Sequence, residues 1–167
     1  MTRLRLSRRA VQSLIAHATK GYEELYKREV GGHLLGYREG RGFSVSRIIP
    51  YNTPYRTRSE WSPNPYHFEK KGRALETKHL KWIGIYHSHV EVAGTASTIQ
   101  SPEDKISHLM SNRPIEIIIR IANYKMNSPK QCLSYSVNFR EEGFYYYDIC
   151  ADMKDKDGRI GRIKVVE

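Results

Sequence analysis

Long apolar runs are absent from this sequence, and cysteine is scarce. No stretch reaches the roughly 18 consecutive apolar residues that a membrane-spanning helix needs, and the charged N-terminus lacks the apolar segment of a secretory signal. We therefore expect a cytoplasmic protein with no membrane partner. The two cysteines, Cys132 and Cys150, lie too far apart for a CxxC motif and are too few to frame a fold. We expect both to be buried, reduced thiols.

Several enzyme signatures are missing as well. The sequence contains no HExxH, no GxSxG and no GxxxxGK[ST], and Cys132 has no recognisable partner histidine for nucleophilic catalysis. With 39% hydrophobic and 28% charged residues, the composition is typical of a globular domain. Internal repeats and Gly/Ser linkers are also absent. We therefore expect one domain over residues 1–167, in which residues 152–167 form a charged turn and a terminal edge strand or tail.

The charge is strongly positive but scattered. The net charge of +10 comes from 28 basic and 18 acidic residues, and such a field favours an acidic partner or nucleic acid. No segment strings five basic residues together, which favours a solvated surface instead. Tyr145, Tyr146 and Tyr147 resemble a stacking platform, although neighbouring strand residues usually divide between core and surface. A nucleic-acid-binding domain is thus an alternative that ranks last.

Apolar periodicity alternates between the two-residue period of strands and the 3.6-residue period of helices. Turn residues separate the apolar segments, and four prolines mark an irregular connection between residues 50 and 65. We expect an α/β fold, in which a mixed sheet is sandwiched by helices. The pattern predicts strands at 4–6, 30–37, 43–49, 82–89, 115–121, 132–138 and 144–149, and helices at 7–26, at 66–80 and from 101.

Two histidines stand two residues apart at the end of a predicted strand. His87 and His89 should share the face of Ile83 and Ile85, because side chains alternate along a strand. Neutral imidazole is a common zinc ligand, and a catalytic site needs a third protein ligand and an open position. Asp104, in the first turn of the next predicted helix, can supply that ligand. Taken alone, however, an HxH pair is often coincidental, and SPED at 101–104 is also an ordinary helix start.

Three motifs in this order resemble the JAMM, or MPN-plus, metallopeptidase family: EVGGHLLG at 29–36, GIYHSH at 84–89 and SPED at 101–104. The resemblance implies a single MPN (JAMM)-like domain, with a curved mixed sheet sandwiched by helices. The chain most resembles the stand-alone prokaryotic and archaeal members of the family. By this resemblance, Zn²⁺ is bound by His87, His89 and Asp104, Glu29 is the general base and acid, and Ser101 helps to stabilise the oxyanion.

The sequence departs from the family pattern in two places. Val90 follows the second histidine where the family usually has proline, and eleven residues rather than seven separate His89 from Ser101. Ser97 stands at the family spacing, but Gln100 then occupies the position of the carboxylate ligand and cannot replace it. We therefore assign the motif to Ser101 and its aspartate. The longer loop contains Gly94 and small polar residues, so we expect a mobile rim that alters substrate access.

The resemblance also implies a function. The expected enzyme is a zinc metallopeptidase that hydrolyses an isopeptide or peptide bond after the C-terminal tail of a ubiquitin-like or sulfur-carrier protein. The identity of that modifier and the oligomeric state stay open. A second alternative is a catalytically silent MPN scaffold that binds a protein partner. Retention of Glu29, both histidines and the aspartate argues against it, because a scaffold needs none of them.

Overall fold

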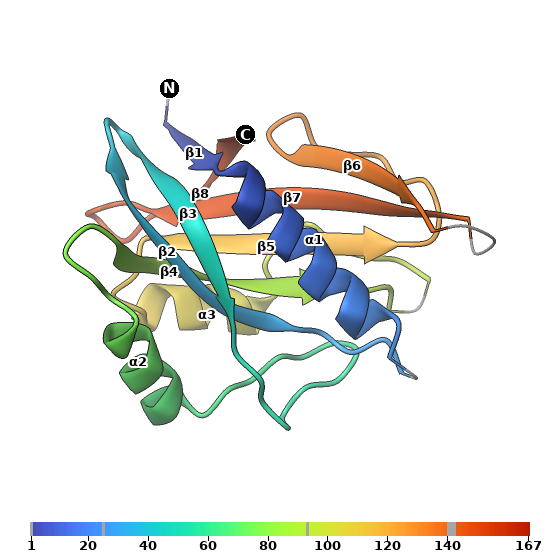
Figure 1. The fold of residues 1–167 in the computed structure, drawn as a ribbon, viewed down its shortest axis with the longest axis horizontal. Helices are drawn as coiled ribbons and strands as arrows, with labels where there is room; N and C mark the ends of the chain where they lie inside the picture. Colours follow the sequence, from blue (N-terminus) through green and yellow to red (C-terminus); the bar gives the residue numbers. More distant parts are fainter. Residues whose placement is uncertain (1, 25, 93, 140–142) are drawn as a thin grey trace.

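The computed structural model describes residues 2–24, 26–92, 94–139 and 143–167. The elements follow the predicted order, although the first two helices end earlier than expected (Figure 1). The elements are β1 (Arg3–Leu6), α1 (Arg8–Tyr22), β2 (Gly31–Glu39), β3 (Gly42–Pro50), α2 (Pro65–Ala74), β4 (Lys81–His89), α3 (Pro102–Met110), β5 (Ile115–Ala122), β6 (Leu133–Asn138), β7 (Phe144–Lys154) and β8 (Ile160–Val166).

Seven of these strands close into a barrel. Their order is β5-β4-β2-β3-β1-β8-β7, and β7 pairs back onto β5 to complete the ring. The eighth strand, β6, pairs with residues 144–149 of β7, on the side opposite β5, and β8 pairs with residues 151–154. Strand β1 is parallel to both β3 and β8, and β4 is parallel to β5, whereas the other pairs are antiparallel. The sheet is therefore mixed, as expected, but it is closed.

The expected fold class, an α/β MPN-like sheet sandwiched by helices, is wrong. Strands make up 42% of the structure and helices 21%, and the sheet wraps around on itself instead of lying between helical layers. The closing pairs join segments that are not consecutive in the chain, since β1 pairs with β8 from the opposite end and β5 pairs with β7. Hydrophobic periodicity locates a strand but does not name its partner, so the closure left no local signal.

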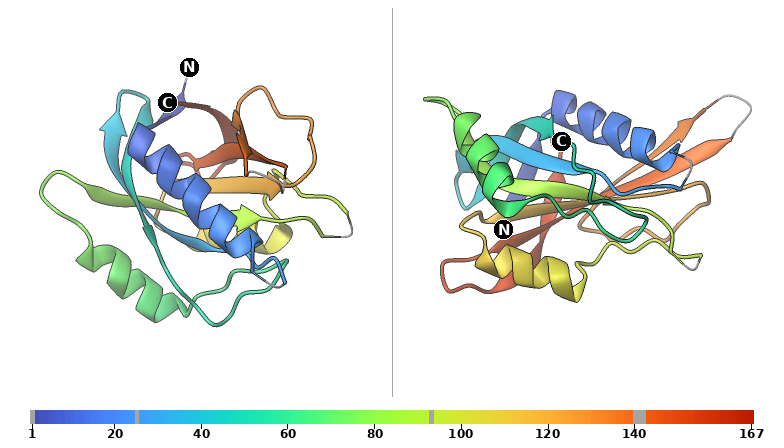
Figure 2. Two further views of the ribbon diagram at one scale, coloured as in Figure 1. Left: turned by 45° about the vertical axis from the view of Figure 1, so that its right-hand side comes forward. Right: turned by 90° about the horizontal axis from the view of Figure 1, so that it is seen from below.

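The apolar core fills the inside of the barrel, and α1 packs against it. Ser7 caps this helix by accepting a hydrogen bond from the backbone N–H of Ala10, at 3.1 Å. Leu14 and Ala18 on the buried face join the core formed by the inward side chains of the strands. In the view from below, α3 lies on the other side of the strands from α1 (Figure 2). The barrel wall thus has an inner apolar face and an outer face that α3 partly covers.

The C-terminal segment is more central than expected. The predicted turn at Asp157 and Gly158 is confirmed, with Gly158 at φ +80° where glycine is favoured. The following strand, β8, is not an edge strand or a tail, because it pairs with β1 on one side and β7 on the other.

The expectation of reduced thiols is also wrong, because Cys132 and Cys150 form a disulfide. The antiparallel register of β6 and β7 explains the pairing. Leu133 lies opposite Ile149, which brings the next residue on each side face to face with a Cα–Cα distance of 4.5 Å. The sequence separation of 18 residues hides this proximity.

Among the described residues, none of the helices combines the length and the apolar character that crossing a bilayer requires.

Candidate metal centre

A bulge in β4 decides which way the two histidines point. The pairing of β4 with β2 shifts its register around Ile83, and such a shift reverses the alternation of side chains. Ile83 therefore joins the inner core, whereas Ile85 packs against a cluster on the outside of the barrel. His87 and His89 follow Ile85 at two-residue spacing and share its outer face. The predicted face is thus correct for Ile85 and wrong for Ile83.

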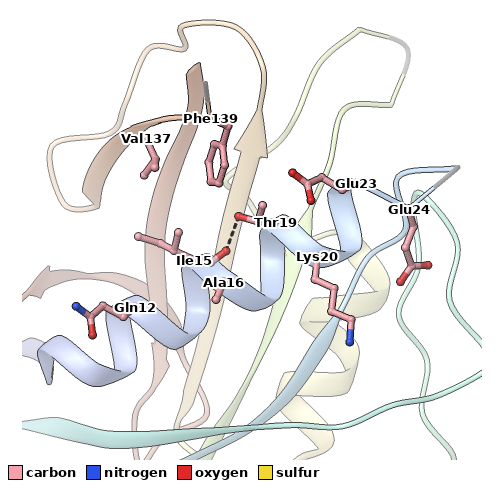
Figure 3. A pocket seen from close by; sticks show the side chains of 9 residues that line it. All are labelled: Gln12, Ile15, Ala16, Thr19, Lys20, Glu23, Glu24, Val137 and Phe139. Atoms are coloured by element: carbon pink, nitrogen blue, oxygen red, sulfur yellow. Dashed lines mark hydrogen bonds between the residues drawn. The ribbon is translucent and has the colours of Figure 1, made fainter. Parts of the chain in front are cut away.

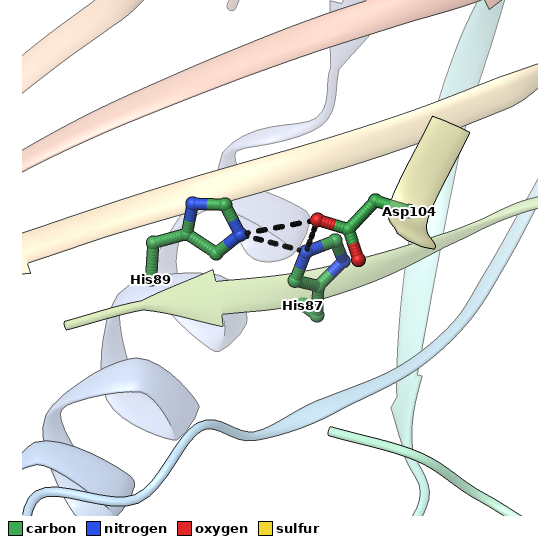
Figure 4. A group of neighbouring side chains, drawn as sticks. All are labelled: His87, His89 and Asp104. Atoms are coloured by element: carbon green, nitrogen blue, oxygen red, sulfur yellow. Dashed lines mark hydrogen bonds and ion pairs between the residues drawn. The ribbon is translucent and has the colours of Figure 1, made fainter. Parts of the chain in front are cut away.

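Helix α3 brings Asp104 to this face. Its first turn is a complete capping box, in which Ser101 accepts from the N–H of Asp104 at 3.1 Å and the Asp104 carboxylate accepts from the N–H of Ser101 at 2.9 Å. The same carboxylate oxygen, Oδ2, lies 3.4 Å from Nε2 of His87 and 3.6 Å from Nε2 of His89 (Figure 4). The cap therefore fixes the carboxylate and aims it between the imidazoles.

The three candidate ligand groups have the spacing of a small metal site. The Nε2 atoms of His87 and His89 are 2.9 Å apart, and the ligand atoms of these histidines and Asp104 all lie within 4.8 Å of one another. Ligand atoms at zinc-bonding distance from one tetrahedral centre are separated by about 3.3 Å. Distances of 2.9, 3.4 and 3.6 Å between these atoms bracket that value. No other His, Cys, Asp or Glu group of this kind occurs among the described residues.

Each imidazole keeps its other nitrogen occupied. Nδ1 of His89 lies 2.9 Å from the backbone carbonyl of Ser97, and a carbonyl can only accept, so this nitrogen carries the proton. Nδ1 of His87 lies 3.3 Å from a carboxylate oxygen of Glu116. Both contacts favour the tautomer whose Nε2 presents a lone pair to the shared centre. Ligating histidines are commonly oriented by such carbonyl or carboxylate partners.

Charge and burial agree with this arrangement. Burial lowers the pKa of His87, and its neighbour His89 contributes in the same direction, so the ring is neutral at neutral pH. Burial alone would raise the pKa of Asp104, but its contacts with both imidazoles outweigh that effect and hold the pKa well below its usual range. A neutral His87 imidazole and an ionised Asp104 carboxylate are thus present together, which suits zinc ligation.

Glu29 is buried beside this group. It precedes β2, where Gly31 pairs with His87, so the antiparallel register carries Glu29 toward the end of β4. Burial, together with the negative charges of Asp104 and Glu60, raises the pKa of Glu29 to about 9. Among the described residues, none donates a hydrogen bond to its carboxylate. The structure therefore brings this side chain into the electrostatic environment of the ligands without direct contact to them.

Ser101 lies next to the candidate ligands because it caps the helix that carries Asp104. Its side-chain oxygen accepts from the Asp104 N–H, and its hydroxyl proton is free to be donated elsewhere. The residue is partly exposed next to the candidate ligands. All five predicted site residues thus lie in one region, with the two histidines and Asp104 in mutual contact.

Three buried residues behind the site were missed in the sequence. Glu116, Gln100 and His108 are all buried, and Glu116 and His108 each place a side-chain atom within 3.3 Å of a neighbour in the group. The signal was present in strand IEIIIRIA, where Glu116 and Arg120 are four residues apart and so share one face of an otherwise apolar strand. Charged residues are rarely buried unless they are paired.

The long loop before α3 is attached to the barrel along residues 96–100, contrary to the expected mobile rim. Arg120 donates from Nη1 to the carbonyl of Ala96 at 3.2 Å, and Arg162 donates to the carbonyl of Thr98. Each guanidinium is in turn paired with a buried aspartate of β7, Asp148 or Asp152. These contacts hold the Ser97 carbonyl against His89.

A separate groove of about 600 Å³ lies between α1 and the β6 end of the barrel (Figure 3). The apolar side chains of Ile15 and Phe139 help to line it, with the charged side chains of Lys20 in α1 and of Glu23 and Glu24 just after the helix. None of the candidate ligands contributes to its lining. The groove therefore belongs to another part of the surface.

Comparisons with known proteins give a fold relationship only. No protein-family model matches the chain, and no curated protein does. Among solved structures, the solution structure of protein DSY2949 from Desulfitobacterium hafniense is similar, with a TM-score of 0.60 and 20% sequence identity. The match covers 98% of this chain and 91% of that one. At this identity, the likeness supports the barrel fold without indicating an activity.

Proposed function

We propose that this chain is a zinc-dependent peptidase of the JAMM type, which hydrolyses an isopeptide or peptide bond after the C-terminal tail of a ubiquitin-like or sulfur-carrier protein. One observation carries the proposal. Nε2 of His87, Nε2 of His89 and Oδ2 of Asp104 converge on one centre, next to the buried carboxyl group of Glu29.

The donor set suits zinc. Two imidazoles and a carboxylate form the three-ligand set of catalytic zinc sites and leave the fourth position for water or substrate. The contacts of both Nδ1 atoms already favour the tautomers that ligation needs, so little reorganisation of the rings is required. A zinc ion held there would lower the pKa of a coordinated water to about 7 and polarise the scissile carbonyl.

Glu29 is suited to moving the proton. Its high pKa without a cation means that the buried site favours the protonated acid, whereas a positive charge at the ligands lowers that pKa toward neutrality. A carboxyl group poised near neutral pH can accept a proton from the attacking water and return it to the departing amine. This role requires no covalent bond between Glu29 and the substrate.

Ser101 is suited to receiving developing negative charge. Because its oxygen is fixed by the Asp104 N–H, its hydroxyl proton can be directed at the carbonyl oxygen of a bound substrate. A preorganised donor of this kind acts on the transition state more than on the ground state. The substrate class itself is inferred from the resemblance of the three motifs, not from the geometry.

Metal content and hydrolysis together test the proposal. The substrates are ubiquitin-like and sulfur-carrier proteins with a fluorogenic amide on the C-terminal carboxyl group. The wild type should contain about one zinc per chain and release the fluorophore. Glu29→Gln should keep its zinc while turnover falls by about 10²- to 10⁴-fold, because only the proton-transfer group is lost.

Glu23→Gln is the matched control, since it removes an exposed carboxylate that does not contact the candidate ligands, and it should leave turnover unchanged. A fully active Glu29→Gln variant would remove Glu29 from the mechanism. A wild-type protein without zinc, even after reconstitution, would overturn the enzyme proposal in favour of a partner-binding scaffold.

A cytoplasmic location is part of the proposal, and the disulfide between Cys132 and Cys150 is the feature that argues against it. Cytosolic thiols are kept reduced in most organisms, with hyperthermophiles as the main exception. Alkylation of free thiols during cell lysis, followed by mass spectrometry, decides the matter. Two alkylated cysteines fit the cytoplasm of a mesophile, and an intact bridge points to an oxidising compartment or a thermophilic source.

A further inference from the structure

Glu116 lies directly behind His87, on the outer face of the barrel. It belongs to β5, where its backbone pairs with Ile85, and it is 2% exposed. One carboxylate oxygen, Oε1, lies 3.3 Å from Nδ1 of His87, and the other, Oε2, accepts a hydrogen bond from the side-chain amide of Gln100. The two oxygens therefore have different partners.

Hydrogen-bond capacity fixes the direction of this chain of contacts. Nε2 of His108 donates to the carbonyl of Pro114 at 3.1 Å, so its Nδ1 is an acceptor. The amide nitrogen of Gln100 lies 3.0 Å from that Nδ1 and also contacts Glu116, so its two protons serve both acceptors. Oε1 of Glu116 remains as the polar neighbour of Nδ1 of His87, at 3.3 Å. Burial raises the pKa of Glu116, whereas a cation at the ligands lowers it, and the ionised carboxylate can only accept. With a metal bound, the proton therefore sits on Nδ1 of His87 and Nε2 keeps its lone pair.

Gln100 comes from the loop that is longer than the family spacing. It is the last residue before the Ser101 cap, and it is 5% exposed. The loop is held at Ala96 and Thr98 by two arginines, which places this amide in a fixed position. The longer loop therefore supplies a buried polar side chain to the back of the metal centre, beyond forming a rim.

We propose that Glu116 is the positioning residue of His87 and that Gln100 holds Glu116 in place, so that the long loop helps to build the ligand set. This inference rests on the proposed zinc site. It assigns Glu116 no contact with substrate. Its effect is to fix the tautomer and ring orientation of His87, which sets how tightly the three ligands bind a metal.

Zinc affinity of the full-length protein, measured by competition with a chromophoric chelator, is the first test. Glu116→Ala should weaken zinc binding by about 10- to 100-fold, the usual effect of losing an outer partner of a ligand. Glu116→Gln retains an oxygen facing Nδ1 and should recover much of that loss. Gln100→Ala should weaken binding by a smaller factor, since Glu116 remains present but less restrained.

Glu76→Ala is the matched control. It removes a partly buried carboxylate that accepts from the backbone N–H of Trp82 at 3.0 Å, at the opposite end of β4 from the two histidines. Unfolding of each variant in chelator shows whether it folds. If Glu116→Ala does not fold, the isosteric Glu116→Gln and the Gln100→Ala variant carry the comparison.

A second readout reports orientation directly. In the zinc-loaded protein, the Nδ1 proton of His87 should give a slowly exchanging downfield NMR signal in the wild type and Glu116→Gln, and should lose its protection in Glu116→Ala. A purely structural role for Glu116 would lower stability without moving this signal. Wild-type zinc affinity together with an unchanged signal in Glu116→Ala would overturn the inference and leave the proposed function standing. Failure of the wild type to bind zinc would overturn both.

Discussion

The two faces of the barrel wall differ in polarity, although the same strands form both. In β5, Ile117 and Ile119 point into the apolar core, whereas Glu116 and Arg120 point outward into a buried polar layer. Both faces are shielded from water, so burial alone does not separate them. The inner face is mostly apolar, whereas on the outer face Glu116 and Arg120 each contact an oppositely charged or polar partner. We infer that the inner face maintains the fold and the outer face maintains the site.

Removing a candidate ligand should produce the largest effect, which is the loss of zinc binding on the outer face without loss of the apolar core. Asp104→Ala should hold less than about 0.1 zinc per chain, because the remaining histidines lack a third ligand. Asp104→Asn, which preserves the cap on Ser101, separates ligation from helix capping. Metal content by elemental mass spectrometry, with unfolding in chelator, measures both. Wild-type zinc content in Asp104→Ala would exclude this residue from the ligand set.

A cavity in the apolar core on the inner face should lower the stability of the protein and leave zinc binding unchanged. Leu14→Ala should lower the free energy of unfolding by about 2–5 kcal/mol, because the side chain is fully buried in the core. Zinc affinity of the folded fraction should stay at the wild-type value. Urea unfolding measures the first quantity and chelator competition the second. As a control, replacing the exposed Gln12 of the same helix by alanine should change stability by less than about 0.5 kcal/mol. A tenfold loss of zinc affinity in Leu14→Ala would show that the two faces do not have separate roles.

The disulfide tests how far the outer face contributes to stability. Replacing both Cys132 and Cys150 by alanine should lower the free energy of unfolding by about 3 kcal/mol, as expected for releasing a loop of this length. Chemical denaturation of oxidised and reduced protein gives the measurement. The double variant is its own control, since reducing agent should leave its midpoint unchanged. Equal midpoints for oxidised and reduced wild type would mean that the bridge adds nothing.

The smallest expected effect is the pH dependence of stability that comes from His17, which packs near the inner face. Burial, aided by the positive charges of Lys20 and Arg56 and opposed by Glu24, lowers the pKa of His17 to about 4. The unfolded chain binds this proton below about pH 6.5, whereas the folded chain does not until about pH 4. Stability should therefore fall as the pH drops from 6.5 to 4, with this residue contributing on the order of 1–3 kcal/mol.

The control for that slope is His17→Gln. Glutamine does not titrate, so the variant should lose part of the pH dependence between pH 6.5 and 4 in urea unfolding. The hydroxyl of Tyr86, 2.8 Å from Nδ1 of His17, can bond to either side chain. An identical slope in wild type and variant would show that other buried histidines account for the whole effect.

Local signals in the sequence were sufficient for the order of the elements and for the local positions of the candidate ligands. The cap at Ser101 and Asp104 and the HxH pair at the end of a strand follow from local spacing, whereas their assignment to one site came from the resemblance of the three motifs. The closure of the barrel could not, because the β1–β8 and β5–β7 pairs depend on contacts between distant segments. The bulge at Ile83 and the partners of Glu116 depend on the same long-range register, which no single segment encodes.

Closing the sheet also controls how this protein can associate with itself. Among the strands in the described ranges, only β6 has a side that no other strand occupies. Unpaired strand edges act as templates for aggregation, and short, polar edges are poor templates. Strand β6 has six residues, and its exposed positions are Ser134, Ser136 and Asn138. Among the described strands, only Leu133–Asn138 therefore offers an edge to a second copy of the folded chain, and its polar exposed positions disfavour such strand addition.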